Sequence, residues 1–274
     1  MRPVNVEKTP HRVVIPIFKP MSPSTDQREN REFAAELKFT VTPLLAEQIR
    51  DWARARLSPD PNASGERHDV YRITSLYFDT ERFDVFRRQG SYGRSKFRIR
   101  RYDFAKTVFL ERKLKTRGLV SKRRSLVPIE ELRRLAETDP ERGWLGSWYH
   151  KRLMVRQLKP VCQISYHRTA RVLMTPRGPI RLTLDENIRS VATNDLVYAD
   201  ADNGVLLMPH QVILELKFRA EMPVLFKLLV EEFALHPQPV SKYRLAVTSL
   251  GLVAESAADT PVNGRLNTIV CLSS

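Results

Sequence analysis

Cysteine and paired histidines are scarce in this sequence. The chain of 274 residues contains only two cysteines, Cys162 and Cys271. Two cysteines give neither a disulfide framework nor a cysteine-based zinc site. The six histidines are scattered, with no pair at i, i+4 spacing, so a histidine zinc site is not indicated either. A reducing compartment fits this composition.

Long apolar runs and glycine-rich phosphate loops are also missing. No stretch approaches the roughly 18 uncharged apolar residues of a membrane helix. The apolar run over residues 13–18 contains Pro16 and is too short for a signal peptide. No P-loop, dinucleotide-binding glycine motif or Gly-x-Ser-x-Gly elbow occurs. We therefore expect a cytoplasmic globular protein without a phosphate cradle of backbone amides.

Positive charge is what the chain has in excess. Its formal net charge is +15, and residues 87–124 alone hold fifteen basic and two acidic side chains. This excess favours a polyanionic partner, which includes nucleic acid, an anionic membrane surface and phosphorylated small molecules.

The basic residues alternate with apolar ones, and this alternation predicts strands. Successive side chains on a strand point to opposite faces, so Lys96, Arg98 and Arg100 share one face. Like charges on neighbouring strands are destabilising unless an anion lies between them. A curled sheet with this pattern would present a wall of cations suited to a chain of phosphates.

The hydrophobic periodicity predicts one α+β domain over residues 32–254, with a flexible leader over 1–31 and a flexible tail over 255–274. Strands are expected over residues 33–41, 71–79, 95–102, 107–115, 125–128, 160–175, 180–187 and 212–219, and helices over 43–57, 129–138, 144–156 and 223–235. Most connections are too short for crossover helices, so the sheet should be antiparallel.

A series of short motifs carries a family resemblance. In chain order they are Glu36-Leu-Lys38, Ser75-Leu-Tyr-Phe-Asp79, Lys96-Phe-Arg98-Ile-Arg100, Leu110-Glu111-Arg-Lys113, Ser121-Lys122, Tyr166-His-Arg168, Arg181-Leu-Thr-Leu-Asp185, Leu214-Glu215-Leu-Lys217 and Ser241-Lys242-Tyr243. The series resembles the VTC domain, the catalytic module of vacuolar transporter chaperone polyphosphate polymerases. The resemblance implies the closed antiparallel eight-stranded tunnel, with packing helices, of the triphosphate tunnel metalloenzymes (CYTH-like superfamily).

The resemblance also implies an activity, which is transfer of the ATP γ-phosphoryl group to a growing polyphosphate chain. It implies catalytic roles for Arg98, Arg100, Lys113, Arg168 and Lys242, phosphate binding by Lys38, Lys122, Arg181, Lys217 and Ser241, and binding of Mn²⁺ or Mg²⁺ by Glu215. ATP and inorganic polyphosphate are the expected partners. Family members in eukaryotes carry additional membrane domains, so we expect a separate membrane protein wherever the product is coupled to transport.

Other functions stay open at this level. Related triphosphatases begin with Glu-x-Glu-x-Lys, and here Ala34 occupies the first position, which favours polymerase over triphosphatase. A third alternative is a non-catalytic module that binds polyphosphate or nucleic acid. We do not expect specific nucleic-acid binding, because Phe97 lies on the opposite face of its strand from Arg98 and offers no stacking platform beside the cations. Glu36, Glu111 and Asp185 are either assisting metal ligands or counter-ions within the tunnel.

Overall fold

A computed structural model describes residues 26–30, 35–61, 63, 69–116, 119–138, 143–200, 202–219 and 221–253. The strands are β1 (Asp26–Asn30), β2 (Ala35–Val41), β3 (Ser58–Pro59), β4 (Val70–Asp79), β5 (Ser95–Tyr102), β6 (Thr107–Thr116), β7 (Leu119–Pro128), β8 (Lys159–Thr175), β9 (Gly178–Ala192), β10 (Val205–Leu206) and β11 (Val212–Phe218). The helices are α1 (Pro43–Arg56), α2 (Asp84–Arg87), α3 (Ser147–Val155), α4 (Val224–Glu232) and α5 (Lys242–Ser249), with 3₁₀ turns η1 (Tyr92–Arg94) and η2 (Ile129–Ala136).

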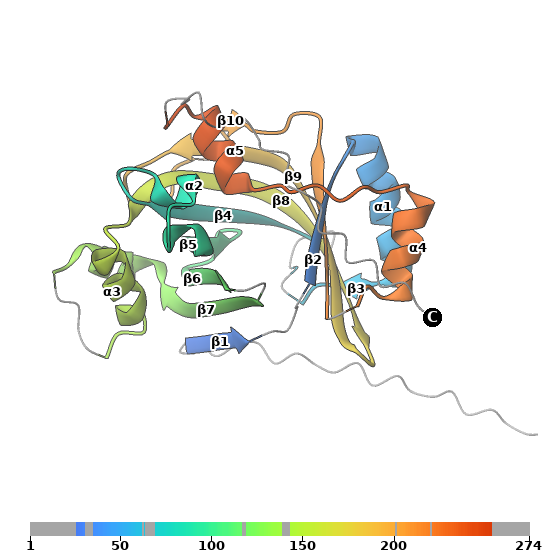
Figure 1. Cartoon of the computed structure of the whole chain (residues 1–274), viewed down its shortest axis with the longest axis horizontal. Coiled ribbons are helices and arrows are strands. Elements are labelled where there is room, and N and C mark those ends of the chain that lie inside the picture. The colour runs from blue at the N-terminus through green and yellow to red at the C-terminus, as the bar shows by residue number, and fades with distance from the viewer. Residues whose placement is uncertain are drawn as a thin grey trace, which may run out of the picture.

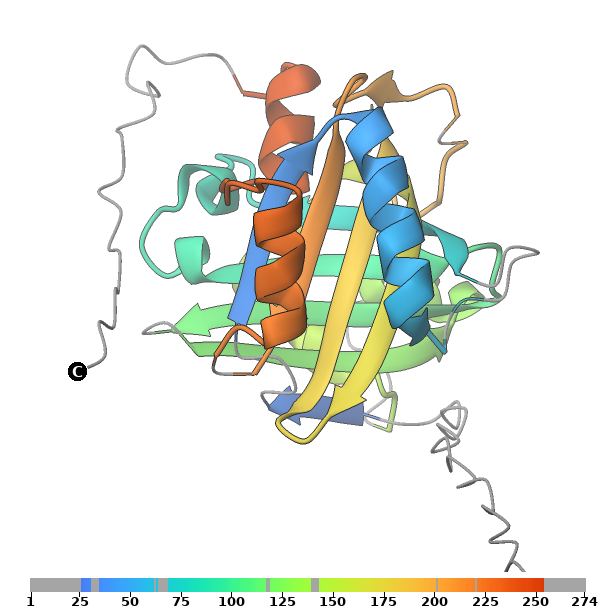
Figure 2. The same cartoon turned by 90° about the vertical axis from the view of Figure 1, so that its right-hand side faces the viewer.

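One antiparallel sheet organises the molecule (Figure 1). Its main path runs β1-β7-β6-β5-β4-β8-β9-β11-β2, while β3 pairs with β8 and β10 pairs with β9. The sheet curls strongly, as Figure 2 shows: β9, β11 and β2 run upright beneath α1 and α4, and β4 to β7 cross behind them. The curl gives the sheet a concave inner face and a convex outer face.

The predicted α+β class and the antiparallel sheet are confirmed, but the sheet differs from the expected tunnel in two details. First, its hydrogen-bonded path through the described residues ends at β1 and β2 instead of closing. The free edge of β7 is taken by β1, which lies inside the segment assigned to the leader. Second, the two halves of the sheet meet through side chains, since Lys113 Nζ on β6 lies 3.2 Å from Glu36 Oε2 on β2. The remaining part of 1–31 and the segment 255–274 lie outside the described residues.

Apolar residues of the strands form two cores, which pack the helices onto the outer face. One core packs α1 and α4 onto β2, β9 and β11, with Phe39, Ile49, Leu214 and Phe226 fully buried. The other packs α3 and α5 onto β4, β5, β6 and β8. Because the apolar side chains face outward into these cores, the alternating polar side chains face the concave side.

Helix α1 begins as predicted, with Thr42 as N-cap and Pro43 in the first turn. The Thr42 hydroxyl accepts a hydrogen bond from the backbone N–H of Leu45 at 3.3 Å. The predicted helix over 129–138 is instead the 3₁₀ turn η2, and the other two predicted helices are shorter than expected. None of the helices in the described ranges is long and apolar enough to span a membrane.

Helix α5 was not predicted, and it carries two of the proposed site residues. Ser241 is its N-cap and Lys242 its first residue. The helix is fixed by Tyr243, whose hydroxyl donates to the buried carboxylate of Asp79. Asp79 also accepts hydrogen bonds from the backbone N–H of Val85 and of Phe86 at the start of α2, at 2.8 and 2.9 Å. A single buried carboxylate thus joins the end of β4 to both α2 and α5.

Candidate functional site

The strand register places basic residues side by side on the inner face. On the β5–β6–β7 side, Lys96 lies opposite Lys113, and Lys113 lies opposite Lys122. On the other side, Lys38 of β2 lies opposite Glu215 of β11. The structure therefore brings together every residue proposed from the sequence: Lys38, Arg98, Arg100, Lys113, Lys122, Arg168, Arg181, Glu215 and Lys217 from strands, and Ser241 and Lys242 from the start of α5.

Glu111 is the acidic centre of the β5–β7 wall. Its carboxylate lies 2.6 Å from Arg98 Nε, 3.1 Å from Lys122 Nζ and 4.0 Å from Arg100 Nε. Burial acts to raise the pKa of Glu111, but Arg98 and Lys122 outweigh it and hold the pKa well below its usual range. Glu111 is thus an anion that offsets repulsion among three cations.

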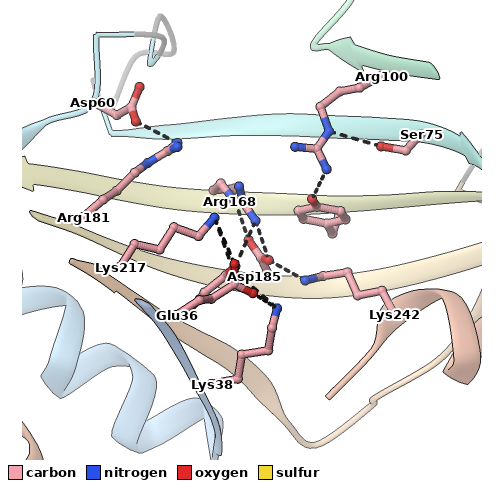
Figure 3. A network of polar contacts seen from close by, with 12 residues as sticks. Glu36, Lys38, Asp60, Ser75, Arg100, Arg168, Arg181, Asp185, Lys217 and Lys242 are labelled. Atoms are coloured by element: carbon pink, nitrogen blue, oxygen red, sulfur yellow. Dashed lines mark hydrogen bonds and ion pairs between the residues drawn. The ribbon is translucent and has the colours of Figure 1, made fainter. Parts of the chain in front are cut away.

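Asp185 has the same role on β9 (Figure 3). It is fully buried and accepts two hydrogen bonds from Arg168, at 2.6 and 2.7 Å, in the forked geometry of a guanidinium–carboxylate pair. Lys242 reaches the same carboxylate from α5 at 2.5 Å. Burial opposes ionisation, but these two cations hold the pKa of Asp185 well below its ordinary value.

Glu36 and Glu215 form a third acidic group, and lysines lie between them. Lys38 Nζ lies 2.9 Å from Glu36 Oε1 and 3.3 Å from Glu215 Oε1. Lys217 Nζ lies 3.2 Å from Glu215 Oε1 and 3.8 Å from Glu36 Oε2. Burial lowers the pKa of Lys217 to about 8 even though both carboxylates act to raise it. Lys217 therefore changes its charge close to neutral pH.

The carboxylates of this face can hold a divalent cation only together with other ligands. No group of three or more His, Cys, Asp or Glu side chains within the described ranges could hold a metal by itself. Glu36 and Glu215 are nevertheless adjacent, and Glu215 is held in its anionic form, because Lys217 and Lys38 outweigh the effect of burial and keep its pKa well below normal. Mg²⁺ and Mn²⁺ take one or two protein carboxylates and complete their shell with water and substrate phosphates. The two glutamates fit such a substrate-completed site.

Two cations also have neutral partners. Lys96 Nζ donates to Ser241 Oγ at 3.1 Å, and partial removal of Lys96 from water, together with the nearby Lys113 and Lys38, lowers its pKa to about 8. Arg100 is buried and contacts Ser75 Oγ at 3.4 Å. It also lies 3.3 Å from the Tyr166 hydroxyl. An anion that enters the tunnel meets positive charge that is not fully compensated here.

Some participants were missed by sequence reasoning. Asp60, in the loop directly after β3, lies 2.7 Å from Arg181, and Tyr71 accepts a hydrogen bond from Arg181 at 2.8 Å. Tyr77 accepts one from Arg98 at 3.3 Å. The sequence pattern could have indicated the tyrosines, because Tyr71, Ser75 and Tyr77 are an even number of residues apart on β4 and therefore share one face. Asp60 had no such pattern, since a loop residue has no periodicity that shows where it points.

The described structure defines an α+β protein of the tunnel type, an antiparallel sheet curled around a face lined with arginines and lysines. The VTC domain family model matches residues 33–251, and the chain belongs to this family. The predicted resemblance is thereby confirmed. A search among curated proteins found no significant match.

Several solved structures match the chain at low similarity. A Bacillus halodurans protein named as a candidate adenylate cyclase has 16% identity and a TM-score of 0.48, covering 75% of this chain and 92% of its own. A Hippeastrum protein, named as a candidate adenylyl cyclase with a dominant triphosphatase activity, has 15% identity and a TM-score of 0.45, covering 79% of this chain and 95% of its own. A Pyrococcus horikoshii protein has 12% identity and a TM-score of 0.44, covering 78% and 99%.

Proposed function

We propose that the tunnel binds ATP through its triphosphate and transfers the γ-phosphoryl group to a growing polyphosphate chain. Membership of the VTC family supports this proposal, and so does the cation-lined inner face. The single observation that carries it is the convergence of five cations on one concave face: Arg98, Arg100, Lys113, Arg168 and Lys242. The acids that pair with them reduce the repulsion among the cations but do not neutralise all of them.

These residues would act by positioning the phosphates and neutralising their negative charge. Phosphoryl transfer spreads negative charge over the oxygens of the transferred group, and fixed cations stabilise that charge without reorganising. Arg98, Arg100 and Arg168 offer forked contacts to two oxygens each, and Lys113 and Lys242 act as point charges. A terminal phosphate of the acceptor chain is already anionic near neutral pH, so the reaction needs no strong general base.

A divalent cation would be held by Glu215, with Glu36 beside it. When bound, Mg²⁺ or Mn²⁺ supplies additional neutralisation of the phosphate oxygens. Lys38 and Lys217 lie against both glutamates, so a bound cation would compete with these lysines for the glutamate oxygens.

The proposal is tested by incubating the purified chain with ATP and Mn²⁺ or Mg²⁺ and separating products on a gel stained for polyphosphate. A ladder of polymer together with ADP is the expected result. Free phosphate without polymer would contradict the proposal and favour a triphosphatase. Binding of triphosphate without any product would leave a non-catalytic module.

Lys113→Ala is the site variant of choice. Its side chain is 44% exposed, and its partner Glu36 keeps Lys38 at 2.9 Å, so the change removes a tunnel cation without leaving an unpaired buried charge. We expect synthesis to fall at least about tenfold while the melting temperature changes little. Lys227→Ala, on the exposed face of α4, is the matched control and should keep full activity. Arg98→Ala is less suitable, because it leaves the buried Glu111 without its closest partner.

A further inference from the structure

One polar group in the tunnel takes no part in the ion pairs. Thr183 lies on β9 and is 1% exposed, and within the described structure its Oγ1 atom is buried without a hydrogen-bond partner. The Nε atom of Arg181, two residues earlier on the same face of the strand, is buried without a partner as well. Buried hydroxyl groups in folded proteins nearly always have a partner, so two orphaned polar atoms side by side require an explanation.

The residue opposite Thr183 on β8 is small. Thr183 lies opposite Ala170 on β8 and opposite Glu215 on β11. Ala170 carries only a methyl group, whereas Arg168 and Tyr166 precede it on the same face of β8. The smallest of these three side chains thus lies opposite Thr183, with Arg168 two residues before it on β8 and Arg181 two residues before Thr183 on β9.

The hydrogen-bonding capacity of the two atoms indicates which ligand suits this place. Glu215, which lies opposite Thr183 on β11, is already contacted by Lys38 and Lys217 and does not bond to the Thr183 hydroxyl. The Thr183 hydroxyl and the Arg181 Nε–H group can both donate, and two donors without an acceptor are complementary to the oxygens of an anion. We propose that Thr183 Oγ1 donates a hydrogen bond to a phosphate oxygen of the bound chain, beside the Nε of Arg181. This inference rests on the proposed function only in taking a phosphate chain as the ligand.

The proposal makes stability and binding respond in opposite directions. Replacing a buried, unsatisfied hydroxyl by a methyl group of the same shape removes a desolvation penalty from the free protein. Thr183→Val should therefore keep or raise the melting temperature of the ligand-free protein, while it lowers the affinity for the phosphate chain. A threonine with a structural partner would show the reverse, with a lower melting temperature.

The experiment is calorimetric titration with inorganic triphosphate, in EDTA and again with Mg²⁺, with thermal unfolding of each variant. We expect about a tenfold weaker affinity for Thr183→Val in both buffers, and affinity within about twofold of the wild type for Thr183→Ser, which restores the hydroxyl. Thr74→Val makes the same chemical change at a buried threonine on the outer face of β4 and should leave binding unchanged.

Each contrary outcome refutes a distinct statement. Wild-type affinity in Thr183→Val, or a clearly lower melting temperature, would overturn the assigned role of Thr183. A loss of affinity seen only with Mg²⁺ would overturn it too, since the hydroxyl would then belong to the cation's shell. A wild-type chain that binds triphosphate but makes no polymer would refute the proposed function and leave Thr183 as a phosphate ligand. A wild-type chain that does not bind triphosphate would overturn both.

Discussion

An acid inside a cation-lined tunnel stabilises the ligand-free protein and also competes with phosphate for the cations. Replacing Asp185 by Asn tests both roles. The carboxylate is fully buried, is bonded at 2.6 and 2.7 Å to Arg168 and is 2.5 Å from Lys242. Asparagine keeps the shape and one acceptor but removes the charge. The ligand-free protein then holds two cations near a neutral group, and it should lose stability and bind phosphate chains more tightly.

The size of the stability loss follows from the burial. Breaking a buried ion pair by removing one partner costs about 3–5 kcal/mol, and the retained amide oxygen places Asp185→Asn near the lower end. One kcal/mol shifts the melting temperature of a domain of this size by about 2–4 °C, so we expect a fall of about 6–12 °C. Glu221→Gln is the matched control, because Glu221 pairs with Arg177 at the same 2.6 Å but both side chains are 77% exposed. An exposed pair contributes about 0–1 kcal/mol.

Thermal unfolding with and without inorganic triphosphate gives the assay. In the wild type, phosphate oxygens must replace the Asp185 carboxylate as the partner of Arg168 and Lys242. In Asp185→Asn no carboxylate at this position competes for the two cations. Triphosphate should therefore raise the melting temperature of the variant by more than that of the wild type. Equal ligand-induced shifts, or a variant as stable as Glu221→Gln, would refute the view that Asp185 competes with substrate.

Two further predictions concern charge and positioning. Because the pKa of Lys217 is lowered to about 8, its ammonium group loses its proton as the pH rises, so triphosphate affinity should fall between pH 7 and 9. Lys217→Arg, which stays charged, should make this fall smaller in a calorimetric pH series, leaving the contribution of Lys96, whose pKa is also lowered to about 8. Tyr243→Phe removes the hydroxyl that ties α5 to Asp79, so Lys242 should be held less firmly; we expect triphosphate affinity to fall severalfold with a loss of stability of about 1–3 kcal/mol, and an unchanged affinity would contradict this positioning role.

The strands and their inner face could be predicted from the sequence, because a period of two is a local signal. The expected strand over 95–102 is β5 to the residue, and Arg98 and Arg100 share its inner face as predicted. Pro43 after Thr42 marked the start of α1 for an equally local reason, since N-cap and first-turn preferences act within a few residues.

What the sequence did not reveal depends on contacts between distant segments. Helix α5 has eight residues, and a helix of that length gains its stability from packing and not from its own propensity. Its anchor is Asp79, which is 164 residues from Tyr243 in the chain. The pairing of Arg181 with Asp60 likewise joins a strand to a loop. The open path of the sheet depends on β1, a segment in which composition favoured a leader.

The acids inside the tunnel explain how so many cations can be buried in the absence of substrate. An arginine taken out of water without a counter-charge is costly, and Glu111, Asp185 and Glu215 each offset that cost for two or three neighbours. The same ion pairs weaken the net attraction for an anion, because a phosphate oxygen must replace a carboxylate oxygen that is already in place. A single phosphate can replace few of these contacts, whereas a chain can replace several at once. Affinity should therefore rise steeply with the number of linked phosphates. A chain could also move along the tunnel stepwise, because each cation that a phosphate leaves can pair again with its carboxylate.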